Sequence, residues 1–162
     1  MITNQKKLEE IIDGVLKPFG FIKRRSAWYR HYPETVLVLD LQKSDYGGQY
    51  YVNLAVSIRE LNRQEYPREE HCHINIRLDR VAGDRETVHK VFDLENRTLT
   101  DDERRQHILE IIGKGSQWLE ALSTLRTITW QLSKNESLRN RTTIQARRFL
   151  NINSLLPTDG NQ

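Results

Sequence analysis

The segment HCHINIRL contains the residue types with the clearest capacity for chemistry in this sequence. Its polar members, His71, His73, Asn75 and Arg77, occupy alternate positions. On a β-strand, alternate side chains project from the same face. Two imidazoles on one face can supply two nitrogen ligands to a zinc ion, and an arginine fork can bind a carboxylate or a phosphate. The spacing therefore indicates two chemistries, metal binding and anion binding.

A zinc site at His71 and His73 would need further ligands from elsewhere in the chain. His31, Glu70 and His89 have suitable side chains, but no H-E-x-x-H or similar motif joins any of them to the pair. The alternative is a pair of solvated or hydrogen-bonded histidines, and the lack of a four-ligand pattern favours it. We therefore expect no metal and no cofactor.

A second polar series follows the pair Gly47-Gly48, which suits a hairpin. In YYVNLAVSI the apolar residues alternate with Tyr51, Asn53 and Ser57, so these polar groups share a face. Antiparallel sheets often leave one face to water, but a merely solvated face favours Lys, Glu and Thr over directional amide, phenol, imidazole and guanidinium groups. We interpret this face as a ligand-binding surface, which Asp40, Gln42 and Ser44 extend if the alternation holds through Leu41. Its candidate residues are Gln42, Ser44, Tyr51, Asn53, His73, Asn75 and Arg77.

Catalysis has candidate residues but no recognisable arrangement. Asp40, Ser44, His73 and Arg77 could supply a general base and an anion holder. The sequence has no G-x-S-x-G elbow and no Walker loop. GKGS at residues 113–116 resembles part of a phosphate loop, but it follows a helical pattern and so predicts a helix end. We expect no catalytic residue, and a small hydrolase or metal-assisted enzyme using the histidine strand is the alternative.

The C-terminal part of the chain is rich in basic residues. Against the single acid Glu136 stand Lys134, Arg139, Arg141, Arg147 and Arg148. A basic helix can bind nucleic-acid phosphates, but a solvated surface helix has the same composition. The aromatic signature of an RNA-reading sheet is missing, and the net charge of the chain is only +3. Nucleic-acid binding is therefore a further alternative.

Two periodicities predict the elements that hold these groups. Apolar residues from Leu8 to Leu16 recur with helical spacing, and Pro18 ends that helix. Four segments then have the alternation and turns of strands, at residues 26–32, 35–43, 49–61 and 71–79. The second strand is apolar on both faces, which indicates cover on both. In the fourth, the residues expected to face the core are Cys72, Ile74, Ile76 and Leu78.

Helical spacing returns after these strands. The capping box TDDE predicts a helix that begins at Thr100 and that GKG at residues 113–115 should end. An apolar stripe from Trp118 to Leu132 and a polar helical segment at 137–150 follow. The expected fold is α+β: a single domain at residues 1–150 with an N-terminal helix, a four-stranded antiparallel sheet and C-terminal helices packed on one face. Residues 151–162 are expected to form a partly disordered tail.

Composition narrows the class of protein. A chain of 162 residues has one cysteine, so no internal disulfide can form. No apolar run is long enough to cross a membrane, and the first residues lack the apolar core of a signal peptide. We expect a cytoplasmic protein that does not bind membranes.

Four segments in the same order carry a resemblance to a known family. KPFGFIKRRSAWYR, LVLDLQKS, the glycine turn with YYVNLAV, and HCHINIRL resemble the bacterial family catalogued as domain of unknown function 4304. The resemblance spans Leu8 to Leu132 and places family positions at Trp28-Tyr29, at Gln42-Lys43-Ser44, at Asn53 and at His73–Arg77. It implies the fold and supplies no activity. The segment from Lys134 onward departs from the family pattern.

These observations favour a non-enzymatic recognition module. Its polar sheet face would bind a protein or an acidic ligand, with Arg77 as the anchor. An immunity or toxin–antitoxin role is one form that such a small protein without catalytic motifs can take.

Overall fold

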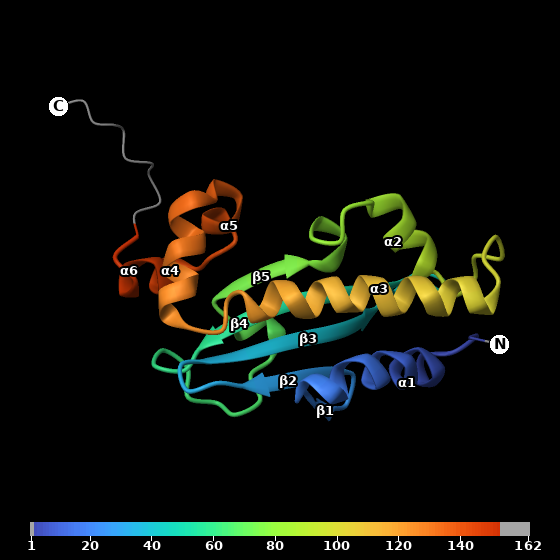
Figure 1. Cartoon of the computed structure of the whole chain (residues 1–162), viewed down its shortest axis with the longest axis horizontal. Coiled ribbons are helices and arrows are strands. Elements are labelled where there is room, and N and C mark those ends of the chain that lie inside the picture. The colour runs from blue at the N-terminus through green and yellow to red at the C-terminus, as the bar shows by residue number, and fades with distance from the viewer. Residues whose placement is uncertain (1, 153–162) are drawn as a thin grey trace.

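The computed structural model describes residues 2–152, which form a five-stranded antiparallel sheet with helices around it (Figure 1). The strands lie in chain order, so each pairs with the next along the sequence. They are β1 (Ile22–Arg24), β2 (Ala27–His31), β3 (Thr35–Lys43), β4 (Tyr50–Ile58) and β5 (Ile74–Arg77). The helices are α1 (Gln5–Leu16), α2 (Arg85–Val91), α3 (Asp101–Glu120), α4 (Leu125–Lys134), α5 (Glu136–Asn140) and α6 (Ile144–Phe149). The expected α+β class with an antiparallel sheet is confirmed.

One face of the sheet forms the main core. Register pairs such as Leu39 with Leu54 and Leu41 with Val52 point to this face, and α1 and α3 cover it (Figure 1). The indole of Trp28 is fully buried there, and its Nε1 donates to Oδ1 of Asp13 in α1 at 3.0 Å. The N-terminal helix is thus fixed to the sheet by burial and by a satisfied polar group.

The opposite face is covered over part of its area by the connection between β4 and β5, residues 59–73. Tyr29, Val36 and Val38 form a second cluster there with Cys72. The ring of Tyr66 lies edge-on to Tyr29, with 5.1 Å between the ring centroids. This packing confirms the prediction that β3 is covered on both faces. It also corrects the prediction for Cys72, which packs opposite to the Ile74 face because β5 begins only at Ile74.

The strand missing from the sequence prediction is β1, so a sheet of four strands was wrong. Residues Ile22–Arg24 are only three, all exposed, and show no apolar alternation. The turn to β2 uses Arg25 with φ of 57°, a left-handed conformation usually marked by glycine or asparagine. A short edge strand with charged side chains leaves little signal in the sequence.

Helix α3 begins with the predicted capping box of Thr100 and Glu103 but continues through residues 113–115 to Glu120, so the predicted end at GKG is wrong. Gly115 is buried where α3 crosses the sheet: a Cβ there would lie 2.8 Å from Cδ1 of Leu78 and 3.5 Å from Leu54. This glycine therefore permits close packing of the helix and does not terminate it.

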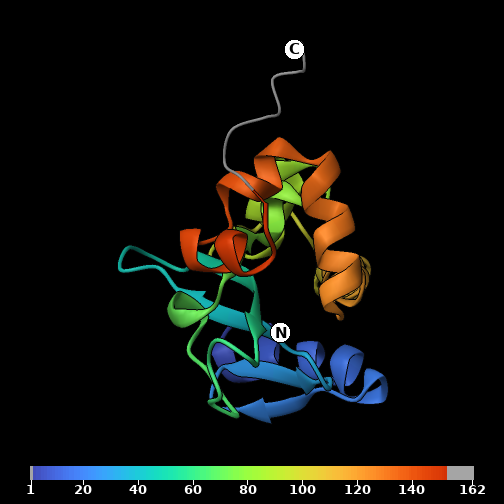
Figure 2. The same ribbon diagram turned by 90° about the vertical axis from the view of Figure 1, so that its left-hand side faces the viewer.

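The C-terminal helices lie at one end of the sheet and along β5, whereas the main face is covered by α1 and α3 (Figures 1 and 2). The segment between α5 and α6 continues past β5: Ile74 forms an isolated bridge with Thr142, and the backbone amide of Thr143 donates to the carbonyl of His73 at 2.8 Å. The predicted helix at 137–150 is therefore two short helices. The predicted tail lies, from residue 153 on, outside the described residues. Between residues 2 and 152, no helix has the length and apolar character to cross a membrane.

Candidate recognition face

Four of the seven predicted residues lie together on the polar face of β3, β4 and β5. In the sheet register Gln42 pairs with Tyr51, and Asn53 pairs with both Asp40 and Arg77. Nδ2 of Asn53 donates to Oδ2 of Asp40 at 3.3 Å and to Oε1 of Gln42 at 3.0 Å. We call these five residues, Asp40, Gln42, Tyr51, Asn53 and Arg77, the recognition face.

Arg77 and Tyr51 form the exposed side of the recognition face. The guanidinium carbon of Arg77 lies 4.0 Å from the centroid of the Tyr51 ring. No carboxylate of the described residues comes within ion-pair distance of this guanidinium, which is exposed. Stacking holds its planar fork on the rigid strand while its N–H groups stay available.

His89 of α2 lies at the edge of the recognition face, a position that the sequence did not predict. The imidazole of His89 lies edge-on to Tyr51, with 6.1 Å between ring centroids, and its Nε2 is 2.7 Å from Oδ2 of Asp79. Asp79 is buried, and its Oδ1 has no hydrogen-bond partner among the described residues. Helix α2 has only seven residues, too few for its apolar spacing to reveal a helix in the sequence.

The other side of the recognition face is acidic. Burial raises the pKa of Asp40, as does Glu70, while the hydrogen bond from Asn53 opposes the rise. Burial also raises the pKa of Glu69, with Asp40 and Glu70 adding to it and Arg77 acting in the opposite direction. The arginine therefore shares its surroundings with three carboxylates, a feature that strand parity alone could not reveal because Glu69 and Glu70 lie in the connection.

Of the remaining three predicted residues, Asn75 lies on the same face of the sheet as Arg77 but is hydrogen-bonded locally, and Ser44 and His73 lie outside the strands. Ser44 follows β3, where its Oγ accepts from the backbone amide of Tyr46 at 3.1 Å. Asn75 is on β5, but its Nδ2 is directed to the carbonyl of Cys72 at 3.4 Å. His73 precedes β5 and is 3% exposed; its Nδ1 accepts from the amide of Ile58 at 2.9 Å, and burial lowers its pKa. His73 is thus a neutral structural group.

The two histidines that suggested zinc do not share a strand face. His71 ends a 3-10 turn at Glu69–His71, and His73 lies before the first residue of β5. The assumption of strand spacing was therefore wrong for this pair. Among residues 2–152 no group of three His, Cys, Asp or Glu side chains is placed to hold a metal ion.

A comparison with protein families gives a match to the domain of unknown function DUF4304 over residues 12–121. The chain belongs to this family. No curated protein and no solved structure matches it. The DUF4304 match includes all five strands, both sides of the recognition face, the whole of α3 and the C-terminal part of α1 from Ile12 on.

The basic segment lies beyond the DUF4304 match and does not form one exposed helix. Lys134 ends α4, Arg139 lies in α5, and Arg147 and Arg148 lie in α6. Arg139 is 6% exposed, and its Nη1 donates to the carbonyl of Leu132 at 2.6 Å. At least this one of the basic residues supports the fold of the C-terminal helices.

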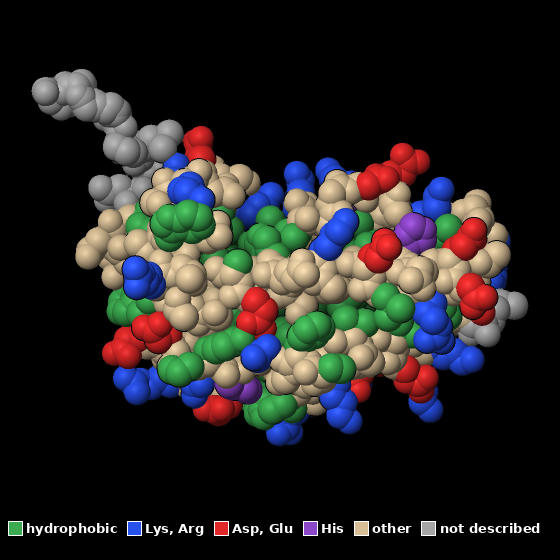
Figure 3. Space-filling view, viewed as in Figure 1, with side chains coloured by type: hydrophobic (Ala, Val, Ile, Leu, Met, Phe, Trp, Pro, Cys, Tyr) green, Lys and Arg blue, Asp and Glu red, His purple; other side chains and the backbone are tan. Residues whose placement is uncertain are grey.

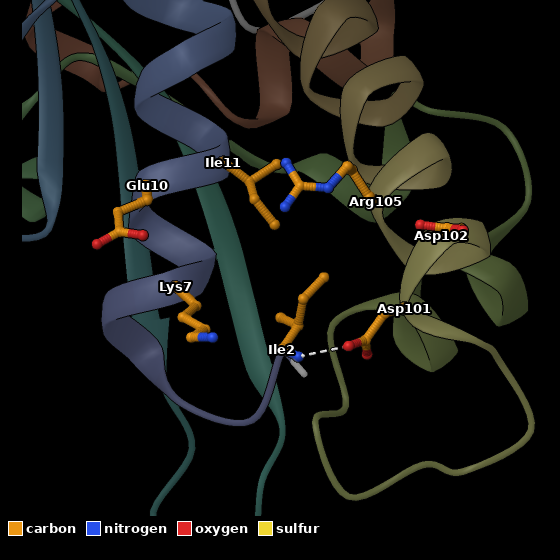
Figure 4. Close-up of a pocket in the computed structure, with 7 residues that line it drawn as sticks. All are labelled: Ile2, Lys7, Glu10, Ile11, Asp101, Asp102 and Arg105. Carbon is orange, nitrogen blue, oxygen red and sulfur yellow. Dashed lines mark hydrogen bonds between the residues drawn. The ribbon is translucent and has the colours of Figure 1, made fainter.

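A hollow of about 360 Å³ lies between the start of the DUF4304 chain and α3 (Figure 4). Its lining includes three acids, Glu10, Asp101 and Asp102, and two basic residues, Lys7 and Arg105. The amide of Ile2 donates to Oδ2 of Asp101 at 3.1 Å, as the dashed line in Figure 4 marks. This hollow marks the attachment of the N-terminal segment to α3.

Proposed function

We propose that this DUF4304 protein is a non-enzymatic recognition module and that its recognition face binds a protein partner. The observation that carries the proposal is the exposed guanidinium of Arg77, which is stacked on Tyr51 and has no carboxylate of the described residues within ion-pair distance. An arginine ordered before binding loses less entropy when it forms two parallel hydrogen bonds.

The charges beside Arg77 indicate which class of partner fits the recognition face. A small acidic ligand would meet Arg77 but also the nearby carboxylates Asp40, Glu69 and Glu70. A protein surface can present an acid or a carbonyl to Arg77 and a Lys or Arg side chain to these carboxylates. Such complementary charge patterns provide specificity and raise association rates. The mixed face therefore favours a protein over an acidic small molecule.

Quantitative affinity capture from a lysate of the source organism tests the proposal. The bait would be the full chain, compared with the variants Arg77→Ala and Arg105→Ala. Arg105 is exposed on α3 and outside the recognition face, so it is the matched control. Partners that bind through the face should be retained by the wild type and by Arg105→Ala and lost from Arg77→Ala, with at least about a tenfold fall in affinity.

A partner captured equally by all three baits would contradict the proposal, provided that Arg77→Ala melts near the wild-type temperature. For a captured partner, chemical-shift changes in the ¹⁵N spectrum should concentrate at Tyr51, Asn53 and Arg77. Changes confined to α4–α6 would place the binding surface elsewhere and would also overturn the proposal.

A further inference from the structure

A second concave surface lies outside the recognition face, between the end of β5, α3 and α5. It has a volume of about 430 Å³, within the range of about 300–1,000 Å³ typical of small-molecule sites. Ile76, Val81 and Leu138 contribute apolar side chains to its lining, and α3 contributes Trp118. In Figure 3, hydrophobic and basic side chains gather in the corresponding area above α3, between the positions of α5 and α2. We call this surface the arginine hollow.

Two arginines give the arginine hollow its charge. Arg80, in the 3-10 turn after β5, and Arg141, after α5, both line it, and no acidic residue does. Neither guanidinium has an ion-pair partner among the described residues, and Nε of Arg141 is buried without a hydrogen bond. A buried unpaired donor costs free energy unless a partner or solvent satisfies it. The arginine hollow therefore presents positive charge without an ion-pair partner beside four apolar side chains and the neutral polar residues Asn135 and Ser137.

Two other hollows of the described chain do not share this character. The one in Figure 4 is lined by three acids, Glu10, Asp101 and Asp102. Another, of about 540 Å³ beside Phe149, is lined by Glu34 and Glu60 together with two arginines. In both, the basic residues share the lining with carboxylates, so an anionic ligand gains less there.

We propose that the arginine hollow binds a small organic carboxylate with an apolar group. The carboxylate would accept hydrogen bonds from Arg80 and Arg141, while the apolar group would contact Trp118 and Leu138. Arginine suits this role because its planar fork matches the two oxygens of a carboxylate. Apolar side chains make up half of the lining, and Asn135 and Ser137 add neutral polar groups, so an apolar group and a carboxylate can both be accommodated. The same chemistry occurs in a free acid and at the C-terminus of a peptide with an apolar last residue.

The experiment uses the full chain and follows the indole N–H signal of Trp118 in ¹H–¹⁵N spectra, assigned with Trp118→Phe. The probes are 3-phenylpropionate as a free acid, N-acetylphenylalanine as a peptide C-terminus, and 3-phenylpropionamide as the uncharged match. Acetate tests charge alone. Both aromatic acids should shift the Trp118 signal at lower concentrations than the amide or acetate. The acid that binds more tightly identifies which of the two sources the hollow prefers.

Arg80→Gln and Arg141→Gln should each weaken binding of the preferred acid about tenfold and leave the amide nearly unchanged, because each removes charged hydrogen-bond donors. Arg148→Gln is the matched control, since Arg148 is exposed on α6 and does not line the hollow. Acid and amide binding with equal affinity, a Trp118 signal that no probe moves, or acetate acting as strongly as the aromatic acids would each overturn the proposal. An equal loss in Arg148→Gln would do the same.

Discussion

The guanidinium of Arg77 lies over the ring of Tyr51, 4.0 Å from its centroid, and so links β5 to β4 on the recognition face. Tyr51 in turn contacts the edge of His89 from α2. The position of Arg77 therefore depends on an aromatic residue of the neighbouring strand and not on an ion pair. This arrangement orders the arginine without neutralising it.

If stacking orders Arg77, the ring of Tyr51 and not its hydroxyl should matter for partner binding. Tyr51→Phe should bind a captured partner as the wild type does, and Tyr51→Leu should bind it about two- to fivefold more weakly, the equivalent of about 0.5–1 kcal/mol for an exposed cation–π contact. Titration calorimetry of the three proteins measures the difference. Equal losses in both variants would assign the effect to the hydroxyl.

The raised pKa of Asp40 predicts a pH-dependent stability. Burial is its main cause, and the folded state then holds the proton more tightly than the unfolded chain. This contribution to stability is fully present below the ordinary carboxyl pKa and is lost as the pH rises through the raised value. Asp40→Asn should therefore be more stable than the wild type at pH 7 and equally stable below about pH 4.

Urea unfolding at both pH values checks the Asp40 prediction. Asp45→Asn is the control, because Asp45 is exposed in the β3–β4 connection. An Asp40→Asn variant that is less stable at pH 7 would show that the charged form is needed to accept the hydrogen bond from Asn53.

Cys72 should be chemically inert in the folded protein. Burial raises the pKa of its thiol to about 12, with Glu69, Asp40 and Glu70 adding to the rise. The thiolate is the reactive form, so it is very scarce near neutral pH. A disulfide reagent such as DTNB at pH 8 should label the native chain only at the rate of unfolding, and the denatured chain at once. Rapid stoichiometric labelling of the native protein would contradict this.

The alternation of apolar residues predicted the centre of the sheet well. In β4, nine residues alternate without interruption, so Tyr51 and Asn53 could be assigned to one face and Val52 and Leu54 to the other. The same rule failed at the N-terminal end of β5. That strand has only four residues. The prediction applied its alternation to Cys72 and His73 as well, but these two residues still belong to the connection before the strand.

The acidic side of the recognition face and the role of the buried arginines had no local signal. Glu69 comes close to Asp40 only because the connection folds back across the sheet. Arg104, an ordinary member of a charged helical sequence, is 3% exposed and donates to backbone carbonyls at the end of α2. Such contacts depend on tertiary structure, so the spacing and composition of a short sequence segment cannot predict them.

Arg104 is therefore predicted to be essential for stability. Its Nη1 donates to the carbonyls of Lys90, Val91 and Asp93, and its Nη2 donates to that of Asn96 at 2.6 Å. Arg104→Met would leave these buried carbonyls without donors and should cost about 2–4 kcal/mol. Arg105→Met, at the exposed neighbouring position, should change stability by less than about 0.5 kcal/mol. Similar urea midpoints for the two variants would show that water replaces the guanidinium.

Two glycines two residues apart in α3 should respond in opposite ways to alanine. At Gly113 nothing lies within 4 Å of the position of a Cβ, so Gly113→Ala should stabilise the helix by up to about 1 kcal/mol through its better helix propensity. At Gly115 the Cβ would lie 2.8 Å from Cδ1 of Leu78, a side chain that is fully buried and cannot move without displacing its neighbours. Overpacking of this kind costs about 1–3 kcal/mol, which exceeds the gain in propensity. Gly115→Ala should therefore have the lower free energy of unfolding of the two, as measured by urea denaturation. If both variants were stabilised equally, α3 could shift on the sheet at little cost, and Gly115 would not be the residue that sets its close approach to Leu78 and Leu54.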